Sequence, residues 1–465
     1  MKKINSLYKD VNYDINISGI KNNYLEVVPG DLFVCVSKNN TERYYQVDEA
    51  IKRGAVCVVV DGDVGKRDVL VVKVENPSGE YPYLVEKYYD LPDLKLKTIG
   101  ITGTEGKSSV GMIIQCLLGK DVCGFLDEDY RILNTYNEKS EFNVNNVYKY
   151  LDEFVKFNCY YAVIEAGSKA LVDGTLKAMD FDICVYTNIM SDHLDVHGNF
   201  DNYFRAKLEL FQKCKDTGIQ VLNKDDIYFS KVLDACKGNV VTYGKYNDCT
   251  LQIVDYKCMY NKTSIVFKYK GFEFKLFSPL LGDFNVYNLA AALLTCLELG
   301  IGLNVLVSRI EKINVPNHLV FLKTDNCFKV MVDYAHTVNS IYRLLSFINT
   351  LNYSSVYVVV GQEGEVDKFR RSGVGEIVVK NSTYAIFTSD NNRREDPNNI
   401  INDITSKIKD YSNYEVVIDR DDAIKKAINM ASDNDIVLIL GKYTDINRVY
   451  SFLADRNLKE SSTEE

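Results

Sequence analysis

The sequence predicts an α/β protein of three domains, with a central nucleotide-binding domain and a C-terminal doubly wound domain. Its 465 residues correspond to roughly three domains of ordinary size, and 46% hydrophobic residues suffice for a core in each. Short apolar runs alternate with helix-like segments along most of the chain, which is typical of parallel sheets. One apolar run leads through a glycine-rich turn into a helix-like segment. We expect the domains at residues 1–95, 96–314 and 315–465.

The first domain is predicted from two apolar runs that flank a helix-like segment. Residues 31–36 and 55–60 have the composition of strands, and residues 47–53 that of a helix. This order favours a parallel pair of strands joined by a crossover. Loops are predicted at two proline-containing stretches, residues 77–79 and 91–93.

The glycine-rich turn of the second domain is predicted to bind phosphate. Apolar residues lead into the stretch Gly103-Thr104-Glu105-Gly106-Lys107-Ser108, and a helix-like segment follows at residues 110–118. The backbone N–H groups of such a turn and the dipole of the helix attract an anion. The lysine would reach the outer phosphates of a nucleotide, and the serine hydroxyl would bind Mg²⁺. The commonest spacing of such loops would place glycine at Ile101, so an ordinary strand-to-helix turn is the alternative.

Two later apolar runs of this domain end in polar residues. Residues 160–165 end in Glu165, and residues 183–188 end in Asn188. In open α/β sheets, ligands collect at the carboxyl ends of the strands. We therefore expect both side chains to converge with the phosphate loop on one site.

The rest of the second domain contains further candidate residues. Two of the four histidines of the chain follow the last of these runs, one of them His193, and a helix predicted at residues 203–212 carries Lys207. Residues 251–277 alternate enough to predict β-hairpins, and an Ala/Leu-rich helix is predicted at residues 289–299.

The third domain is predicted to contain a second doubly wound sheet. Its five apolar runs are residues 329–332, 356–360, 385–388, 416–418 and 436–440. Polar residues follow several of these runs, at residues 333–336, 389–393 and 441–442.

Composition excludes several other classes of protein. The net charge of −9 argues against a nucleic-acid-binding protein, which normally carries a basic surface. The 12 cysteines show no metal-binding spacing and are expected to be reduced, as in a cytoplasmic protein. Residues 1–10 are polar, and no apolar run approaches the roughly 18 residues of a membrane span. We expect no membrane partner.

Taken together, these stretches resemble the Mur ligase family from about residue 18 to about residue 450. The resemblance is strongest to the members that add the third residue of the peptidoglycan stem peptide. The matches follow the order of the family. They are the phosphate loop at residues 103–108, Glu165, the signature at residues 187–198, the segment 203–211 around Lys207, and the C-terminal signatures at residues 333–337 and 390–397.

The resemblance implies an ATP-dependent, ADP-forming ligase that joins an amino acid to a carboxylate through an acyl-phosphate. It implies ATP and Mg²⁺ as cofactors, small-molecule substrates, and a cytoplasmic monomer that serves peptidoglycan synthesis. The implied catalytic residues are Lys107, Glu165, His193 and Lys207, and the implied metal ligands are Ser108, Glu165, His193 and Lys207, the last as a carbamate. The implied nucleotide-binding residues are Gly103, Thr104, Glu105, Gly106, Lys107, Ser108, Ser109, Asn188, Asn285, Asn288, Asp333 and His336. The implied substrate-binding residues are Thr135, Ser168, Asp390, Asn391, Arg393, Gly441 and Asp445.

Each of these residues also has a structural interpretation. His193 could be an ordinary loop histidine, and Lys207 a lysine on a helix surface. The asparagines before the Ala/Leu-rich helix could be its N-caps. Asp333 and His336 could cap the end of a strand.

Departures from the family pattern lie along the predicted substrate path. Residues 22–24 and 41–43 replace the Asp-Ser-Arg and Asp-Gly-His of the family, and Thr175 lies where a substrate-binding arginine is expected. Arg393 matches the arginine that binds the distal carboxylate in diaminopimelate-adding members. Asp445 replaces a glutamate and could hold an amine, one methylene shorter.

These departures leave three functions open. The first is a ligase that acts on UDP-N-acetylmuramoyl-L-alanyl-D-glutamate. The second is a paralogue that uses a carboxylate acceptor without the muramoyl group. The third is a nucleotide-binding scaffold with reduced catalysis. A folylpolyglutamate-type ligase is disfavoured because that group lacks the first domain.

Overall fold

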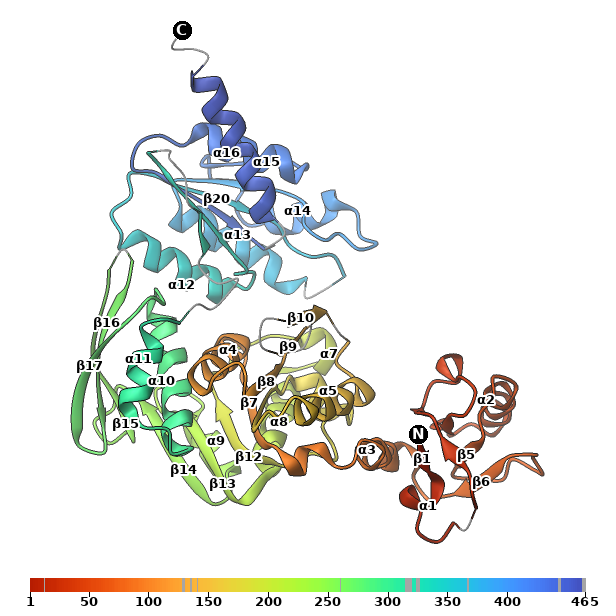
Figure 1. Cartoon of the computed structure of the whole chain (residues 1–465). Helices are drawn as coiled ribbons and strands as arrows, with labels where there is room; N and C mark the ends of the chain where they lie inside the picture. Colours follow the sequence, from red (N-terminus) through yellow and green to blue (C-terminus); the bar gives the residue numbers. More distant parts are fainter. Residues whose placement is uncertain are drawn as a thin grey trace. The chain divides into compact units, whose positions relative to one another are not determined.

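The computed structural model describes residues 1–11, 13–127, 130–133, 136–139, 141–259, 261–313, 320–322, 327–365, 368–441 and 445–461. Figure 1 traces the chain from its N-terminus to its C-terminus and labels its helices and strands. The chain divides into two compact units, each formed from several segments. The first unit comprises Met1–Gly103, Ile114–Thr187 and Phe204–Val241. The second comprises Thr104–Ile113, Asn188–Tyr203 and Thr242–Glu465.

The N-terminal part of the first unit contains a four-stranded parallel sheet in the order β3-β4-β5-β6. Its strands are β3 (Ile20–Lys21), β4 (Leu32–Val34), β5 (Cys57–Val60) and β6 (Leu70–Lys73). The predicted parallel pair is therefore confirmed. Helix α2 (Asn40–Lys52) joins β4 to β5 and begins well before residue 47, because the side chain of Asn39 accepts the backbone N–H of Glu42.

The loop predicted at residues 77–79 is wrong, because helix α3 (Pro77–Tyr88) begins there. Proline is well suited to the first turn of a helix, where no N–H is required, and the side chain of Asn76 accepts the N–H of Gly79. The remaining short elements of this part of the chain are β1 (Lys2–Lys3), α1 (Ile4–Leu7), β2 (Asn16–Ile17), η1 (Tyr24–Glu26) and η2 (Pro92–Lys95).

The larger sheet of the first unit has a parallel centre in the order β8-β11-β7-β12-β13. These strands are β7 (Lys97–Thr102), β8 (Cys123–Leu126), β11 (Tyr161–Glu165), β12 (Phe181–Tyr186) and β13 (Cys214–Asn223). The antiparallel strands β9 (Tyr130–Leu133) and β10 (Tyr136–Lys139) extend it beside β8. The helices along this part of the chain are α4 (Lys107–Leu118), α5 (Val144–Lys156), α6 (Ser168–Val172), α7 (Leu194–His197), α8 (Phe200–Gln212) and α9 (Phe229–Ala235).

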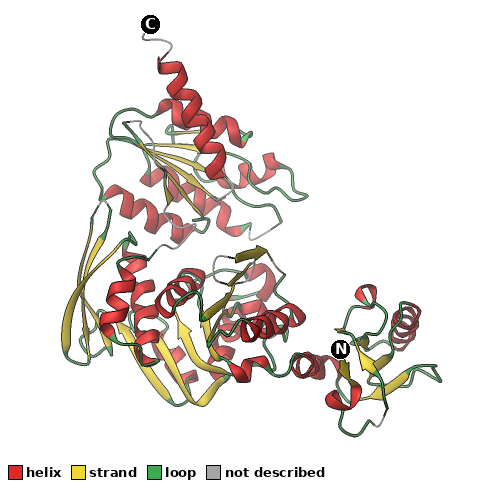
Figure 2. Cartoon of the chain, in the orientation of Figure 1, coloured by secondary structure: helices red, strands yellow, loops and turns green. Residues whose placement is uncertain are grey.

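The second unit continues from β14 (Asn239–Gly244) into the predicted β-hairpins, which are confirmed. They consist of β15 (Leu251–Cys258), β16 (Thr263–Tyr269) and β17 (Phe272–Ser278). Helices α10 (Asp283–Glu298) and α11 (Leu303–Ile310) follow (Figure 2). The Ala/Leu-rich helix is thus longer than predicted and begins at Asp283.

The C-terminal sheet has the order β18-β19-β23-β20-β21-β22 and is parallel except at β18. The strands are β18 (Val320–Phe321), β19 (Lys329–Asp333), β20 (Val356–Val360), β21 (Tyr384–Phe387), β22 (Tyr414–Val416) and β23 (Ile436–Leu440). The helices are α12 (Val338–Asn349), α13 (Phe369–Asn381), α14 (Pro397–Thr405), α15 (Arg420–Met430) and α16 (Asp445–Ser461).

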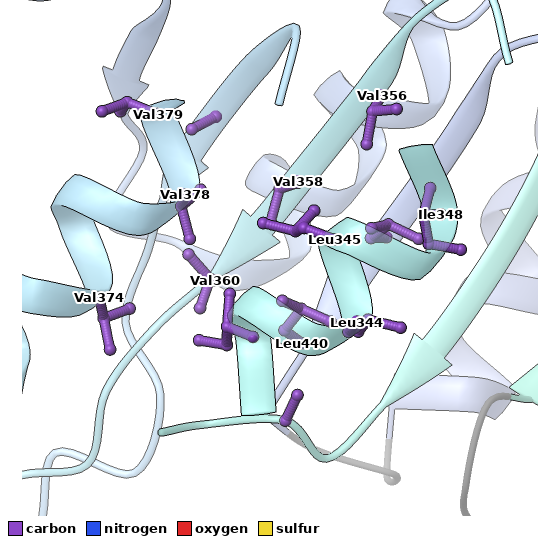
Figure 3. Packing of buried hydrophobic residues seen from close by; sticks show 14 of the residues in the cluster. Leu344, Leu345, Ile348, Val356, Val358, Val360, Val374, Val378, Val379 and Leu440 are labelled. Carbon is purple, nitrogen blue, oxygen red and sulfur yellow. The ribbon is translucent and has the colours of Figure 1, made fainter. Parts of the chain in front are cut away.

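Alternating side chains of this sheet fill two hydrophobic cores, one on each face. Val358 and Val360 of β20 pack with Leu344 of α12 and Val374 of α13 (Figure 3). Val359, which lies between them in sequence, belongs to the other core, with residues of α15 and α16. Helices therefore cover both faces, and the predicted doubly wound α/β fold is confirmed. Across the described part of the chain, no helix combines the length and apolarity of a membrane span.

Candidate active site

Three neighbouring parallel strands bring the first candidate residues together at the carboxyl ends of these strands. Strand β7, which leads into the phosphate loop, lies between β11 and β12. Glu165, the last residue of β11, pairs in register with Ile101 of β7, and the backbone N–H of Ala166 donates to the carbonyl of Ile101 at 2.8 Å. The carboxylate of Glu165 is buried, with 3% of the residue exposed. A buried acidic group therefore lies beside the strand that carries the phosphate loop.

Asn188, which follows β12, fixes the backbone of the phosphate loop. Its Oδ1 accepts the N–H of Glu105 at 3.0 Å, and its Nδ2 donates to the carbonyl of Glu105, also at 3.0 Å. Its own carbonyl accepts the N–H of Thr104 at 2.8 Å. These three hydrogen bonds hold two consecutive residues of the loop, so Asn188 acts here as a support of the loop backbone.

The hydroxyl of Thr104 holds the loop through further hydrogen bonds. Its Oγ1 accepts the N–H of Met190 at 2.9 Å and lies 2.9 Å from the hydroxyl of Tyr203 on α8. Lys107, the first residue of α4, directs its Nζ to the carbonyl of Thr104 at 3.1 Å. The ammonium group is thus folded over the loop, where a phosphate would be bound.

Gly106 can only be a glycine in this loop. Its φ of +82° lies in the left-handed region, and a Cβ would lie 2.4 Å from Oδ1 of Asn288 on α10. Asn288 donates to Oδ1 of Asn285 at 3.1 Å, and Asn285 donates to the carbonyl of Leu281 at 2.8 Å. Both asparagines lie inside α10, whose N-cap is Gly282, so they are not N-caps. They support the phosphate loop from α10.

The carboxylate of Glu105 is held by residues at the N-terminus of α12. Thr337 Oγ1 donates to Oε1 at 2.6 Å, and Asn339 Nδ2 donates to Oε2 at 3.0 Å. A negative charge is favourable there because the helix dipole presents its positive end. Glu105 is therefore bound by protein groups through its side chain as well as its backbone.

A cavity of about 310 Å³ lies beside this loop within the second unit. Thr104, Glu105, Asp192 and Arg370 are among the residues that line it. The guanidinium of Arg370 lies 4.0 Å from the carboxylate of Asp192 and donates through Nε to Gln362 Oε1 at 3.1 Å. The cavity therefore lies beside the phosphate loop and is lined by one guanidinium and two carboxylates.

Asp333 is the last residue of β19, and His336 follows the strand by three residues. Oδ1 of Asp333 accepts the N–H of Ala335 at 2.8 Å, and its carbonyl accepts the N–H of Gly441 at 3.0 Å. Nδ1 of His336 lies 2.9 Å from the carbonyl of Tyr334. Burial and the nearby charge of Arg370 lower the pKa of His336. Asp333 shapes the strand end, as its structural interpretation predicts.

Lys207 is not a surface lysine. Only 2% of the residue is exposed, and its Nζ donates to the carbonyl of Gly103 at 2.5 Å. A buried ammonium group therefore touches the first residue of the phosphate loop. Ser108 and Ser109 belong to the first turn of α4, which continues from this loop.

His193 lies in a different setting from Lys207. Its backbone is left-handed, with φ of +52°, and about half of its side chain is exposed. Its Nε2 lies 3.6 Å from Oδ2 of Asp192. The described residues contain no group of three or more His, Cys, Asp or Glu side chains that could hold a metal ion.

Four of the predicted amino-acid-binding residues follow strands of the C-terminal sheet: Asp390, Asn391 and Arg393 follow β21, and Gly441 follows β23. Arg393 also has a left-handed backbone, with φ of +50°, and its Nη2 lies 3.2 Å from Oε2 of Glu363. The carbonyl of Asn391 accepts the N–H of Gly364 at 2.9 Å. A Cβ on Gly441 would lie 2.7 Å from Oδ2 of Asp390, so these two residues are in close contact.

Asp445 is fully buried, with 0% exposed. Its Oδ2 accepts hydrogen bonds from Nε and Nη2 of Arg420 at 2.9 and 2.7 Å. Ser168 begins α6 in the first unit and is buried. Thr135 lies outside the described residues.

Several residues that shape the site were not singled out from the sequence. Tyr203, Arg370 and Arg420 support the loops through side-chain contacts that join distant parts of the chain. A tyrosine or arginine on an amphipathic helix gives no local signal of such a role. Tyr203 lies in the segment 203–211 that resembles the family, and the resemblance is what marks this tyrosine as part of the site.

Comparisons with known proteins agree with this architecture. Residues 101–296 match the Mur ligase middle domain, and residues 319–443 match the Mur ligase, glutamate ligase domain. The UDP-N-acetylmuramoyl-L-alanyl-D-glutamate--2,6-diaminopimelate ligase of Fusobacterium nucleatum is 32% identical over 450 residues, covering 93% of this chain and 90% of the relative.

Solved structures extend the similarity to nearly the whole chain. A structure of a UDP-N-acetylmuramoyl-L-alanyl-D-glutamate--2,6-diaminopimelate ligase superposes with a TM-score of 0.71 at 24% identity, covering 98% of this chain and 99% of the other. The MurF ligase of Thermotoga maritima, solved in complex with ADP, superposes with a TM-score of 0.64 at 18% identity, covering 95% and 98%. At these identities the structural matches establish the fold.

Proposed function

This chain belongs to the Mur ligase family, and we propose that it joins 2,6-diaminopimelate to UDP-N-acetylmuramoyl-L-alanyl-D-glutamate with conversion of ATP to ADP. Members of the family are ATP-dependent amide ligases, and the names of the relatives supply the two substrates. The observation that carries the proposal is the phosphate loop, in which Asn188, Thr104 and Gly106 fix the backbone beneath the ammonium group of Lys107.

We assign the chemistry of the first step to this loop. A carboxylate becomes a good acyl donor when it takes the γ-phosphoryl group of ATP, and negative charge then spreads over the phosphate oxygens. The Lys107 ammonium and the backbone N–H groups of the loop would stabilise that charge. Because hydrogen bonds hold the loop in place, little reorganisation is needed when the nucleotide binds. The amine of the amino acid would then attack the acyl-phosphate and release phosphate.

The donor chemistry suits Mg²⁺, which prefers oxygen ligands. Glu165 offers a carboxylate that is buried at the edge of the sheet beside β7, and Ser108 offers a hydroxyl in the first turn of α4. Bound Mg²⁺ would neutralise charge on the phosphates. Lys207 is buried against the loop, and we propose that it serves the same centre as a carbamate. We also propose His193, whose side chain is half exposed, as a ligand.

Each of the three predicted domains is assigned one substrate in this proposal. We propose that residues 1–95 bind the nucleotide-linked acceptor, that residues 96–314 bind ATP, and that residues 315–465 bind the amino acid. Arg393 would pair with the distal carboxylate of the amino acid by a two-point contact. We further propose that the enzyme acts as a monomer in the cytoplasm.

A second acceptor is favoured by two residues of the N-terminal domain. Arg43, which stands within the family's Asp-Gly-His position, is buried in an ion pair with Asp61. Asn23, within the Asp-Ser-Arg position, accepts the N–H of Leu25 and caps η1. Both side chains are engaged within the fold, so a carboxylate acceptor without the muramoyl group is the alternative substrate.

A panel of acceptors distinguishes the two. Purified protein is incubated with ATP, Mg²⁺ and either UDP-N-acetylmuramoyl-L-alanyl-D-glutamate or simpler γ-glutamyl acceptors, each with diaminopimelate or lysine. The products are identified by mass spectrometry. A product only from the UDP-linked acceptor with diaminopimelate supports the proposal, whereas a product from another pair replaces it. If ATP binds but no pair gives a product, the scaffold function is favoured.

A further inference from the structure

Arg420 connects three segments that carry predicted amino-acid-binding residues. It is the first residue of α15 and is buried, with 7% exposed. Its Nη2 donates to the carbonyl of Leu440 at 2.8 Å, and its Nη1 lies 3.5 Å from the carbonyl of Ser389. Its Nε and Nη2 both donate to Asp445. One guanidinium thus joins the end of β23, the segment after β21 and the start of α16.

Each of these contacts lies at or directly beside a candidate residue. Leu440 precedes Gly441, and Ser389 precedes Asp390. Gly441 has φ of +113°, and its Cα lies so close to the Asp390 carboxylate that a Cβ would be 2.7 Å from Oδ2. A shift of either strand end would therefore move Asp390.

The negative charge of Asp445 is compensated by Arg420 inside the fold. Asp445 is fully buried, and its Oδ2 receives two hydrogen bonds from the same guanidinium. Its Oδ1 has no hydrogen-bond partner among the described residues. A carboxylate paired in this way is a poor partner for an incoming ammonium group, because that ammonium would have to be desolvated next to Arg420.

We infer that Arg420 is a positioning residue for amino-acid binding, and that Asp445 acts through Arg420 rather than by contact with the amino acid. This inference rests on the proposed function, and it deepens the assignment of the C-terminal site. The pair fixes the backbone at Asp390 and Gly441, and these residues with Arg393 then meet the substrate. The distal amine of diaminopimelate is consequently not recognised by Asp445.

The test compares Arg420→Met, Asp445→Asn and the double variant with wild type. The rate is measured as a function of each substrate, with both diaminopimelate and 2-aminopimelate, which lacks the distal amine. We expect each single variant to raise KM for the amino acid about tenfold or more and to leave KM for ATP unchanged. Because the two residues act as one unit, the double variant should be no worse than Arg420→Met. The preference for diaminopimelate over 2-aminopimelate should stay within about twofold in all variants.

A matched control separates this effect from loss of a link between two helices. Arg448 of α16 pairs with Asp421 of α15 at 3.1 Å, but on the surface. Arg448→Met should therefore behave as wild type. Arg420→Met leaves a buried carboxylate without its partner and risks unfolding, so the double variant, which removes both charges, keeps the test valid. Folding is checked by thermal denaturation.

Three results would overturn the inference. The first is a loss of preference for diaminopimelate in Asp445→Asn that Arg420→Met does not share, which would show direct contact with the amine. The second is additive effects in the double variant. The third is an unchanged KM for the amino acid in folded variants. If wild type itself makes no product with diaminopimelate, the proposed function fails instead, and the two failures are thereby distinguished.

Discussion

Gly106 offers the sharpest test of how the phosphate loop is built. The variant Gly106→Ala places a side chain at φ of +82°, which costs roughly 1–2 kcal/mol for any L-residue. The new Cβ would also lie 2.4 Å from Asn288 Oδ1. Asn288 cannot turn away without breaking its hydrogen bond to Asn285, so we expect a further cost of about 1–3 kcal/mol from overpacking.

A matched control isolates the backbone cost. Gly271, in the turn between β16 and β17, has φ of +88° and nothing within 4 Å of its Cβ position. Gly271→Ala should lose only the roughly 1–2 kcal/mol of strain in the free energy of unfolding, measured by urea denaturation. Gly106→Ala should lose about 2–5 kcal/mol, the sum of both terms. Its affinity for ADP should fall at least tenfold, while Gly271→Ala should bind ADP as wild type does.

The contact with Asn288 is tested by a double-mutant cycle. In an Asn288→Ala background the obstacle is gone, so adding alanine at position 106 should cost only the strain term. An equal cost in both backgrounds would refute the packing argument. A Gly106→Ala variant that is as stable as Gly271→Ala and binds ADP normally would refute the assigned loop geometry.

Three further predictions concern charged groups. Burial and the nearby charge of Asp93 raise the pKa of Glu86 to about 7. The contribution of Glu86 to stability is therefore fully present below about pH 4.5, where the group is protonated in both states, and it is lost as pH rises through about 7. Glu86→Gln should therefore unfold at a higher temperature than wild type at pH 8 but not at pH 4. The exposed Glu75 gives a control, since Glu75→Gln should unfold at the wild-type temperature at both pH values. An equal change in the unfolding temperature of Glu86→Gln at pH 4 and pH 8 would contradict this. Arg371 is fully buried between Glu395 and Asp403, and Arg371→Met should lose about 3–5 kcal/mol of unfolding free energy at pH 7 by denaturant titration. The pKa of Glu395 is lowered mainly by its hydrogen bond to Arg371, so this loss should shrink as pH falls below about 4.5, and a pH-independent loss would argue against the pair. Glu165→Gln should raise the Mg²⁺ concentration for half-maximal ADP formation at least tenfold, and an unchanged Mg²⁺ titration would remove Glu165 from the metal site.

Much of the fold could be predicted from local patterns. Four apolar runs predicted for the third domain became β19, β20, β21 and β23, because strands buried on both faces are almost continuously hydrophobic. The run predicted at residues 416–418 overlaps β22 only at Val416, because that edge strand is partly exposed and less hydrophobic. Helix ends were less predictable, since they depend on single caps. Asn39 starts α2 earlier than predicted, and Asn76 starts α3 where a loop was predicted.

The candidate site was predictable where it lies in one short stretch and not where it depends on distant contacts. The phosphate loop and Glu165 could be identified because each directly follows an apolar run. The environment of Asp445 could not, since its partner Arg420 precedes it by 25 residues and approaches it only once α15 and α16 are packed. Likewise, the contact of Thr337 with Glu105 spans 232 residues.

The central claim is that ATP cleavage at the Lys107 loop is coupled to formation of one amide bond. The most direct measurement is the ratio of ADP to tripeptide product, for wild type and for Lys107→Ala, with UDP-N-acetylmuramoyl-L-alanyl-D-glutamate and diaminopimelate. We predict one ADP per product in wild type, no ADP when the acceptor is omitted, at most one ADP per enzyme molecule when diaminopimelate is omitted, and neither ADP nor product with the variant. ADP formed over many turnovers without product, or a Lys107→Ala variant as active as wild type, would contradict the account.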